Sequence, residues 1–441
     1  MSRATRFILA LLVAALYAGG LTLAQGDAPL LAQAAADHDD HDDEHDDEHD
    51  EHDDDHDHDH GHDDDHADDH ADDHDHDHGG TAGMRLLVTS ADEPVSIVLD
   101  LATGAEIARF TTPGIGSVYQ LPDPRYAAIT HRSEHRVTFV HSGLSTVDHG
   151  DHMDLLQGSP YVLQTMNVGR QPTHFFARGT DIGIFNDEDG TIAWLDTRLL
   201  GISLDYTEIV TAQSDHGSLA VIDDYVLSGH LRLARVDVYD RDGTLLETFE
   251  GCPGLHGQAV HDHTVVFGCS DGVLLVEVHH GGTFSAHKIA NPAGSSDDAR
   301  VGTLVSDDRN PIVYGNFGSG LALIDVEART MTSTPLPAAP IGMRFAEHGE
   351  ALIVLTGDGF LHRLDATDGL VLASVEVANA TRPDRPRASL AVLGEYAYIG
   401  DPDHGRVVEV DLDHMETLRH FDVSLTPGGV AVMAIPGAVL D

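Results

Sequence analysis

The stretch Val236-Asp-Val-Tyr-Asp240, the turn Arg241-Asp-Gly243 and the second run Thr244-Leu-Leu-Glu-Thr-Phe249 carry the pattern that decides the fold. Each run is short and rich in residues that favour β-strands, and Asp-Gly between two such runs is a hairpin signal. We therefore expect two antiparallel strands that are joined by a tight turn.

Similar runs recur along the chain from Met84 onward, roughly 39 to 55 residues apart. Together with the first stretch they make eight units. The other seven units are residues 95–100 with 105–110, 136–141, 192–196, 274–279, 321–325 with 330–334, 360–365 with 370–375, and 407–411 with 416–421.

Short strands at this period, joined by Asp-Gly, Thr-Gly and Asp-Asp turns and without an amphipathic helix pattern, predict an all-β fold: a β-propeller of four-stranded blades. We predict eight blades, with seven as the alternative count. A solenoid of β-hairpins is the competing fold, but solenoid repeats are usually shorter than about 40 residues. The Gly-His and Trp-Asp signature of WD40 repeats is absent from the sequence.

Alignment of the units brings histidines onto one face of the predicted disc. The run that enters the innermost strand of a blade lies at the mouth of the central channel. Three neighbouring copies of this run carry His174, His216 and His256. The loop after the second strand of a blade opens on the same face, and this loop begins near His131 in one unit and near His230 in another.

The longest connection, residues 142–171, contains the sequence His149-Gly-Asp-His-Met-Asp154. A loop of this length in a compact repeat protein is usually functional or disordered, and we expect it to offer ligands at the channel mouth. Imidazole and carboxylate satisfy a zinc site without thiolate. The sequence therefore predicts a metal site on this face, with the candidate ligands His131, His149, His152, His174, His216, His230, His256, Asp151, Asp154 and Asp215.

The chain has two cysteines, Cys252 and Cys269. Their aligned positions, before the first strand and after the second strand of one blade, place both on the same face. In an exported chain such a pair predicts a disulfide, because an oxidising compartment pairs thiols. A zinc site built on the two thiolates is the alternative.

Residues 37–78 consist almost only of aspartate, glutamate and histidine. No apolar residue larger than alanine occurs there, so we expect a disordered tract. Recurring imidazoles with acids between them predict many weak, exchanging metal sites, and an acidic tail with incidental histidines is the alternative. The histidines of this tract are His38, His41, His45, His49, His52, His56, His58, His60, His62, His66, His70, His74, His76 and His78.

Arg3 and Arg6 precede an apolar run over residues 7–18, which is followed by small residues and by two cleavage motifs, Thr22-Leu23-Ala24 and Ala32-Gln33-Ala34. This pattern is typical of a secretory signal, so we expect export. The predicted organisation is a signal peptide over residues 1–34, with cleavage after 24 or 34, the tract over 35–83, and the propeller over 84–441. An uncleaved membrane anchor is the alternative, and no other segment has the length of about 20 apolar residues that a membrane span needs.

The formal charge is −51, and the tract contributes 25 of the 75 acids and none of the 24 basic residues, which leaves −26 for the rest. Nucleic acid is therefore excluded as a partner. The sequence contains no Gly-x-Ser-x-Gly, no His-Glu-x-x-His and no phosphate-binding glycine loop. We expect no enzyme activity, although a propeller hydrolase with a metal in its channel stays open as an alternative.

A secretion signal, an Asp/His-rich tract, and a propeller with the entry sequences Thr173-His174, Asp215-His216-Gly217 and Leu255-His256-Gly257 resemble the periplasmic zinc metallochaperone AztD family. The resemblance covers nearly the whole mature chain. It implies that zinc is held on the propeller face and near the His-rich segment. It also implies that zinc is passed directly to the solute-binding protein of a bacterial zinc ABC transporter.

The leading hypothesis is therefore a periplasmic chaperone that captures Zn(II) with the tract, holds one ion at the propeller face and transfers it by ligand exchange. We expect the mature chain to be a monomer without a membrane span. The alternatives are a propeller metallohydrolase, and a metal buffer or interaction scaffold in which the propeller only displays the tract.

Overall fold

A computed structural model describes residues 83–150, 153–296 and 299–435 of the chain. The chain divides into two compact units, Met1–Asp73 and His74–Asp441, and every described residue belongs to the second. The described residues form β-strands and three single-turn 3-10 helices, with no α-helix in these ranges. The 3-10 helices are η2 (Arg132–Glu134), η3 (Thr197–Leu199) and η4 (Glu347–Gly349).

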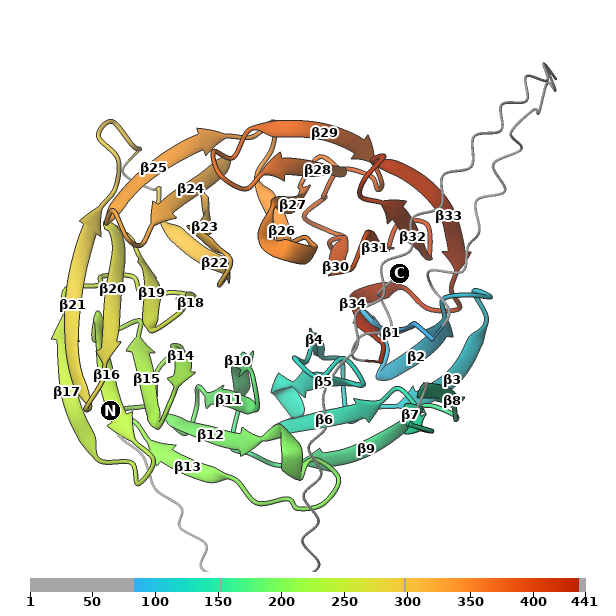
Figure 1. Cartoon of the computed structure of the whole chain (residues 1–441), viewed down its shortest axis with the longest axis horizontal. Helices are drawn as coiled ribbons and strands as arrows, with labels where there is room; N and C mark the ends of the chain where they lie inside the picture. The colour runs from blue at the N-terminus through green and yellow to red at the C-terminus, as the bar shows by residue number, and fades with distance from the viewer. Residues whose placement is uncertain (1–82, 151–152, 297–298, 436–441) are drawn as a thin grey trace, which may run out of the picture. The chain divides into compact units, whose positions relative to one another are not determined.

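Eight four-stranded antiparallel sheets surround a central space as the blades of a propeller (Figure 1). The predicted all-β propeller and the count of eight blades are both confirmed. The innermost strand of each blade borders the central space, and the next three strands follow outward in alternating direction.

From the inside outward, blade 1 contains β34 (Pro427–Met433), β1 (Arg85–Ser90), β2 (Val95–Asp100) and β3 (Glu106–Thr111). Blade 2 contains β4 (Ser117–Gln120), β5 (Tyr126–His131), β6 (Arg136–His141) and β9 (Tyr161–Met166). Blade 3 contains β10 (Pro172–Arg178), β11 (Asp181–Asn186), β12 (Thr191–Asp196) and β13 (Thr207–Val210). Blade 4 contains β14 (Gly217–Ile222), β15 (Tyr225–His230), β16 (Arg235–Asp240) and β17 (Leu245–Glu250).

Blade 5 contains β18 (Gln258–His261), β19 (Thr264–Cys269), β20 (Gly272–His279) and β21 (Thr283–Ala290). Blade 6 contains β22 (Val301–Asp307), β23 (Asn310–Phe317), β24 (Gly320–Asp325) and β25 (Thr330–Pro335). Blade 7 contains β26 (Pro340–Phe345), β27 (Ala351–Thr356), β28 (Phe360–Asp365) and β29 (Val371–Glu376). Blade 8 contains β30 (Ser389–Leu393), β31 (Tyr396–Asp401), β32 (Arg406–Asp411) and β33 (Glu416–Asp422).

The ring closes within blade 1, because β34 from the C-terminal end of the described chain pairs with β1 from its beginning. The other blades each take their four strands from one continuous stretch. In each sheet the runs that the sequence marked as paired strands, such as β16 with β17, are the two outer strands of a blade. The aligned entry runs contain the innermost strands themselves or the residues just before them.

The core lies between neighbouring blades, where the faces of their sheets pack together. The core cluster that spans blades 3 to 5 includes Phe185, Trp194, Leu219 and Phe267. Packing is close at Gly217, where a Cβ atom would lie 2.2 Å from the Phe185 ring. Glycine is therefore required at this position, directly after His216, and the close contact fixes blade 4 against blade 3.

The strand directions define two faces of the ring. We call the face on which the innermost strands begin the entry face. The first and third strands of a blade end on the opposite face, because neighbouring strands are antiparallel. Gly83 precedes β1, a second strand, and therefore lies on the opposite face.

Residues 142–160 form a connection on the opposite face, since they follow β6, the third strand of blade 2. They fold into a separate hairpin of β7 (Leu144–Asp148) and β8 (Met153–Gln157), which lies at the outer edge of the ring in Figure 1. The expectation that this loop reaches the mouth of the channel beside the histidines is therefore wrong. The loop connects the third strand of blade 2 to the fourth, and such a connection lies on the opposite face.

No helix in the described part of the chain is long and apolar enough to cross a membrane. The predicted signal peptide and the Asp/His-rich tract, with all 14 of its histidines, lie outside the described residues.

Candidate metal centre

Three histidines from neighbouring blades meet on the entry face. His174 lies in β10, His216 directly precedes β14, and His256 precedes β18 by two residues. The potential ligand atoms of the three side chains all lie within 4.8 Å of one another, which no other group of three His, Cys, Asp or Glu side chains among the described residues achieves. The Nε2 atoms of His174 and His216 are 3.1 Å apart. We call this group the histidine cluster.

The ring centroids of the histidine cluster are 4.7 to 5.3 Å apart, so the rings surround one point. Zinc binds imidazole nitrogen at about 2.0 to 2.1 Å and takes four ligands in a tetrahedron. Three imidazoles converging in this way provide three ligands and leave one position for a fourth. The cluster therefore has the donor type, number and proximity that a single zinc ion needs.

Burial favours the neutral imidazole at two members of the cluster, His174 and His256. Burial, followed by repulsion from His216 and His256, lowers the pKa of His174 to about 3. Burial also lowers the pKa of His256, with hydrogen bonding to Gly302 acting in the other direction. Metal binds the neutral ring, so protons compete weakly with a metal ion at these two side chains.

Asp187 orients His216. Its Oδ2 accepts a hydrogen bond from Nδ1 of His216 over 2.9 Å, which leaves Nε2 of that ring facing His174. Burial would raise the pKa of Asp187, but hydrogen bonds from His216, Thr173 and Arg132 hold it below the usual value. A carboxylate on the far nitrogen of a metal-binding histidine fixes the ring and raises its basicity.

Asp187 was not among the predicted site residues. Its Oδ2 also pairs with Nη2 of Arg132 at 3.2 Å, and its Oδ1 is buried without a hydrogen-bond partner. The available signal was its position: Asp187 directly follows Asn186, the last residue of β11, in the same aligned loop that contains His131 and His230 in other blades.

His256 is held by its backbone and by its ring. Its backbone N–H donates to the carbonyl of Gly268, and its Nδ1 lies 3.0 Å from the carbonyl oxygen of Gly302. The next residue, Gly257, has φ of +74°, and a Cβ there would lie 1.9 Å from the Gly302 carbonyl oxygen. Only glycine fits this turn, which explains the Leu-His-Gly sequence.

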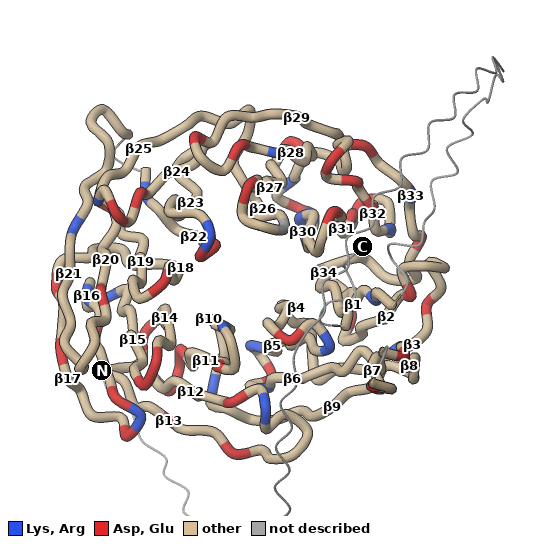
Figure 2. Tube along the Cα trace, in the orientation of Figure 1, with Lys and Arg blue, Asp and Glu red and all other residues tan. Residues whose placement is uncertain are grey.

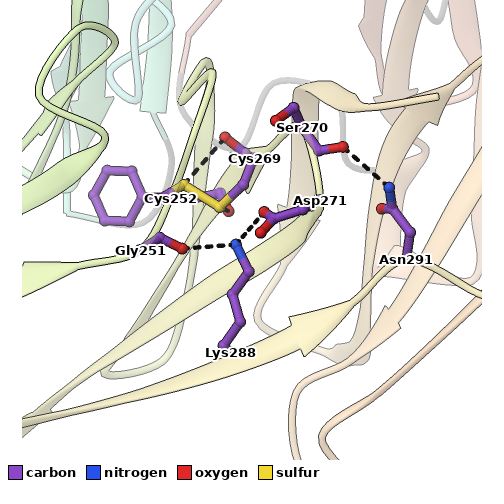
Figure 3. Close-up of a disulfide and its surroundings, with 9 residues drawn as sticks. Gly251, Cys252, Cys269, Ser270, Asp271, Lys288 and Asn291 are labelled. Carbon is purple, nitrogen blue, oxygen red and sulfur yellow. Dashed lines mark hydrogen bonds and ion pairs between the residues drawn. A yellow bond between two sulfur atoms is a disulfide. The ribbon is translucent and has the colours of Figure 1, made fainter. Parts of the chain in front are cut away.

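A disulfide ties the loop that carries His256 to blade 5 (Figure 3). The predicted pairing of Cys252 with Cys269 is confirmed, with Cα atoms 5.0 Å apart and both side chains fully buried. The thiolate zinc site is therefore wrong, because both sulfur atoms are bonded to each other. Lys288 reinforces the loop by donating to the carbonyl of Gly251 and pairing with Asp271.

No family model matches the chain. A curated relative, from Citrobacter koseri (strain ATCC BAA-895 / CDC 4225-83 / SGSC4696), is 24% identical over 376 residues, which cover 80% of this chain and 87% of the relative. That relative is the zinc chaperone AztD. The resemblance to AztD that the sequence suggested is therefore confirmed.

Two solved structures of Citrobacter koseri AztD, one of them the apo form, match with TM-scores of 0.72 and 0.73. Both are 22% identical and cover 80% of this chain and 98% of AztD. The dihydro-heme d1 dehydrogenase NirN matches with a TM-score of 0.56 at 13% identity, over 81% of this chain and 76% of NirN. At these identities the structures establish a shared fold with AztD and with NirN.

The structure does not bring His131 and His230 into the histidine cluster. Both end the second strand of their blade, as expected, but their side chains are completely buried. In His131, Nδ1 lies 2.8 Å from the carbonyl oxygen of Gly114 and Nε2 lies 3.1 Å from Thr138 Oγ1. In His230, Nε2 lies 3.3 Å from Ser228 Oγ and 3.4 Å from Asp237 Oδ2. These rings connect the strands of a blade.

Asp215 is buried, and its carboxylate holds the loop rather than facing the cluster. One oxygen accepts from the backbone N–H of His216 and the other from the backbone N–H of Arg232. Its guanidinium partner is Arg232, at 3.2 Å. Asp215 therefore positions His216 through the backbone.

His149 and Asp154 lie at the tip of the β7–β8 hairpin on the opposite face, where His149 Nε2 is 3.1 Å from Asp154 Oδ2. They lie on the other face of the ring from the histidine cluster, because the hairpin follows the third strand of its blade. Asp151 and His152 lie outside the described residues.

Proposed function

We propose that this protein is a periplasmic zinc metallochaperone that captures Zn(II) and passes it to the solute-binding protein of a zinc ABC transporter. The observation that carries the proposal is the convergence of His174, His216 and His256 within 4.8 Å. The likeness to the zinc chaperone AztD over 80% of the chain supports the choice of zinc.

Zinc is cargo in this proposal, and the three imidazoles hold it at the entry face. A tetrahedral ion with three protein ligands keeps one position open. An incoming partner donates its own ligand at that position, and the ion then moves by successive exchange of histidines without passing through water. The tract supplies zinc by raising its local concentration.

Ligand strength at the cluster is set by residues behind it. Asp187 accepts from Nδ1 of His216, and the Gly302 carbonyl is within hydrogen-bond distance of Nδ1 of His256. Both contacts place the proton on Nδ1 and leave Nε2 as the ligand atom. Arg132, which is half exposed, pairs with Asp187. A docking partner that contacts Arg132 therefore weakens the hydrogen bond between Asp187 and His216.

The test is a zinc titration of the full chain against a competing chelator that keeps free zinc too low for the weak tract sites. We expect one tight zinc per chain, and we expect its loss when His174, His216 and His256 are changed to alanine together. A matched control replaces three exposed histidines outside the cluster, His263, His280 and His287. The control should keep the tight zinc.

Transfer is tested by mixing the zinc-loaded protein with a metal-free solute-binding protein in the presence of the same chelator. Transfer faster than zinc dissociation supports direct exchange. Retention of tight zinc by the triple variant would refute the site. Substrate turnover that depends on bound zinc would favour the metallohydrolase, and metal that stays only with the tract would favour the buffer or scaffold.

A further inference from the structure

Two cavities lie among the innermost strands. One has a volume of about 570 Å³ and is bordered by Tyr119, Phe175, Gln258, Ser306 and Arg344, among others. The second has a volume of about 430 Å³ and is bordered by residues that include Thr303, Arg344, Arg387 and Ser389. Arg344 of β26 borders both cavities, and no residue of the histidine cluster borders either of them.

The acids of the larger cavity are already neutralised. Asp307 pairs with Arg309 at 2.7 Å, and Asp308 pairs with Arg178 at 2.6 Å. Asp308 also accepts the backbone N–H of Asp262. The carboxylates of this cavity therefore do not balance a further positive charge.

Arg344 carries such a further charge. Its described hydrogen bond runs from Nη1 to the carbonyl of its neighbour Met343, over 2.7 Å. Among the described residues it has no ion pair with a carboxylate. Its side chain is exposed, and the lining of the smaller cavity contains Arg344 and Arg387 but no carboxylate.

Arg387, which lies just before β30, adds a second guanidinium at the smaller cavity. Its side chain is exposed and makes no ion pair with the described residues. Figure 2 shows a basic segment near β30 beside the central space, in a chain whose net charge is −51.

We propose that the central space binds a small oxyanion, either a carboxylate or a phosphate, through Arg344 and Arg387. A guanidinium presents a planar fork of N–H donors that fits either group with two parallel hydrogen bonds. An anion there would pair with two guanidinium groups that have no described carboxylate partner. Tyr119 and Phe175, stacked with centroids 4.6 Å apart, give the larger cavity one flat aromatic wall. This proposal does not depend on zinc binding.

The test uses the metal-free full chain at about pH 8 and low ionic strength, where screening is weak and histidines are neutral. Inorganic phosphate and citrate are titrated separately by calorimetry. We expect saturable binding of at least one of them at one site per chain. We expect binding at least about tenfold weaker in Arg344→Gln and in Arg387→Gln, because each loses a charge-assisted hydrogen bond.

The matched control is Arg241→Gln, which removes the same charge from a rim arginine that pairs with Asp224 and stacks on Trp194. Its affinity should equal that of the unchanged protein. Binding of citrate alone identifies a carboxylate site, and binding of phosphate alone identifies a phosphate site. Arg387→Gln breaks no described contact, so its thermal midpoint should not change. Absence of binding by both anions, or an affinity in Arg344→Gln and Arg387→Gln equal to that of the unchanged protein, would overturn the proposal.

Discussion

What a histidine of this propeller can do depends on the partners of its two ring nitrogens. His216 has Nδ1 on Asp187 and Nε2 towards His174, whereas His131 has both nitrogens engaged inside its own blade. The first arrangement leaves one nitrogen directed at a shared point, and the second leaves none. Both are histidines that the sequence places on the entry face, so the difference lies in the neighbours of each ring.

Asp187→Asn tests the carboxylate behind the cluster. The change keeps the size of the side chain but removes the negative charge that accepts from His216. We expect zinc affinity to fall by roughly 10-fold to 100-fold, as for other partners of metal-binding histidines. Competition titration measures it, and Asp189→Asn, whose carboxylate pairs with Arg170, is the control. Unchanged affinity in Asp187→Asn would contradict the role of this carboxylate.

His131 provides a prediction for pH. Burial lowers its pKa below the usual value for histidine, which is about 6.5. Below pH 6.5 the unfolded chain therefore binds a proton that the folded protein resists, so the contribution of His131 to stability is complete above pH 6.5 and is lost as the pH falls.

The variant His131→Gln should be less stable at pH 7.5 by about 1 to 3 kcal/mol, because Thr138 and the Gly114 carbonyl lose a partner. Its stability should then fall less between pH 7.5 and 5.5 than that of the unchanged protein. Urea unfolding at both pH values measures the difference. Zinc affinity should stay the same, and a large loss would return His131 to the set of ligands.

At the scale of elements, the position of a loop in its blade determines which face it occupies. Loops before the first strand and after the second share the entry face, which brings together the loops of His174, His216 and His256, the Asp187 loop and the disulfide. The β7–β8 hairpin follows a third strand and lies on the other face. Strand direction therefore places the β7–β8 hairpin on one face and the loops of His174, His216 and His256 on the other, although all of them carry histidine.

The disulfide gives the prediction at this scale. Changing Cys252 and Cys269 to alanine removes a link across 17 residues and should lower the free energy of unfolding by about 3 kcal/mol. Zinc affinity should also fall, because the loop that places His256 is released at Cys252. Chemical unfolding and zinc competition measure the two effects. Full zinc affinity in a destabilised double variant would show that Gly257 and Gly268 suffice to place His256.

At the scale of the molecule, the histidine cluster needs the closed ring. Its side chains come from three consecutive blades, and the blades are kept in place by the core between them and by β34 pairing with β1. The tract of residues 37–78 contributes none of these three side chains. It does contribute half of the formal charge, 25 acids of a net −51.

Deletion of residues 37–78 should therefore leave one tight zinc site with unchanged affinity. Loading at scarce zinc should become slower, because a tether with many weak sites no longer concentrates the ion near the protein. Stopped-flow loading at fixed low free zinc measures the rate, and equilibrium competition measures the affinity. Loss of the tight site on deletion would contradict this division between capture and storage.

The sequence by itself determined the architecture. Strand period, turn chemistry and the spacing of units are local properties, so they predicted eight four-stranded blades, and aligning the units predicted that His174, His216 and His256 share a face. The same alignment predicted the disulfide between Cys252 and Cys269, since the two loops are adjacent in one blade.

The tertiary structure alone decided which of the ten candidates converge. Side-chain direction and burial depend on contacts between strands and blades, and these contacts are set by residues distant in the chain. Asp187 lies 29 residues before the His216 ring that it orients, and Gly302 lies 46 residues after the His256 ring that it contacts. His131 and His230 occupy the predicted positions, but packing turns their rings into the blade, because a buried imidazole must find its hydrogen-bond partners there.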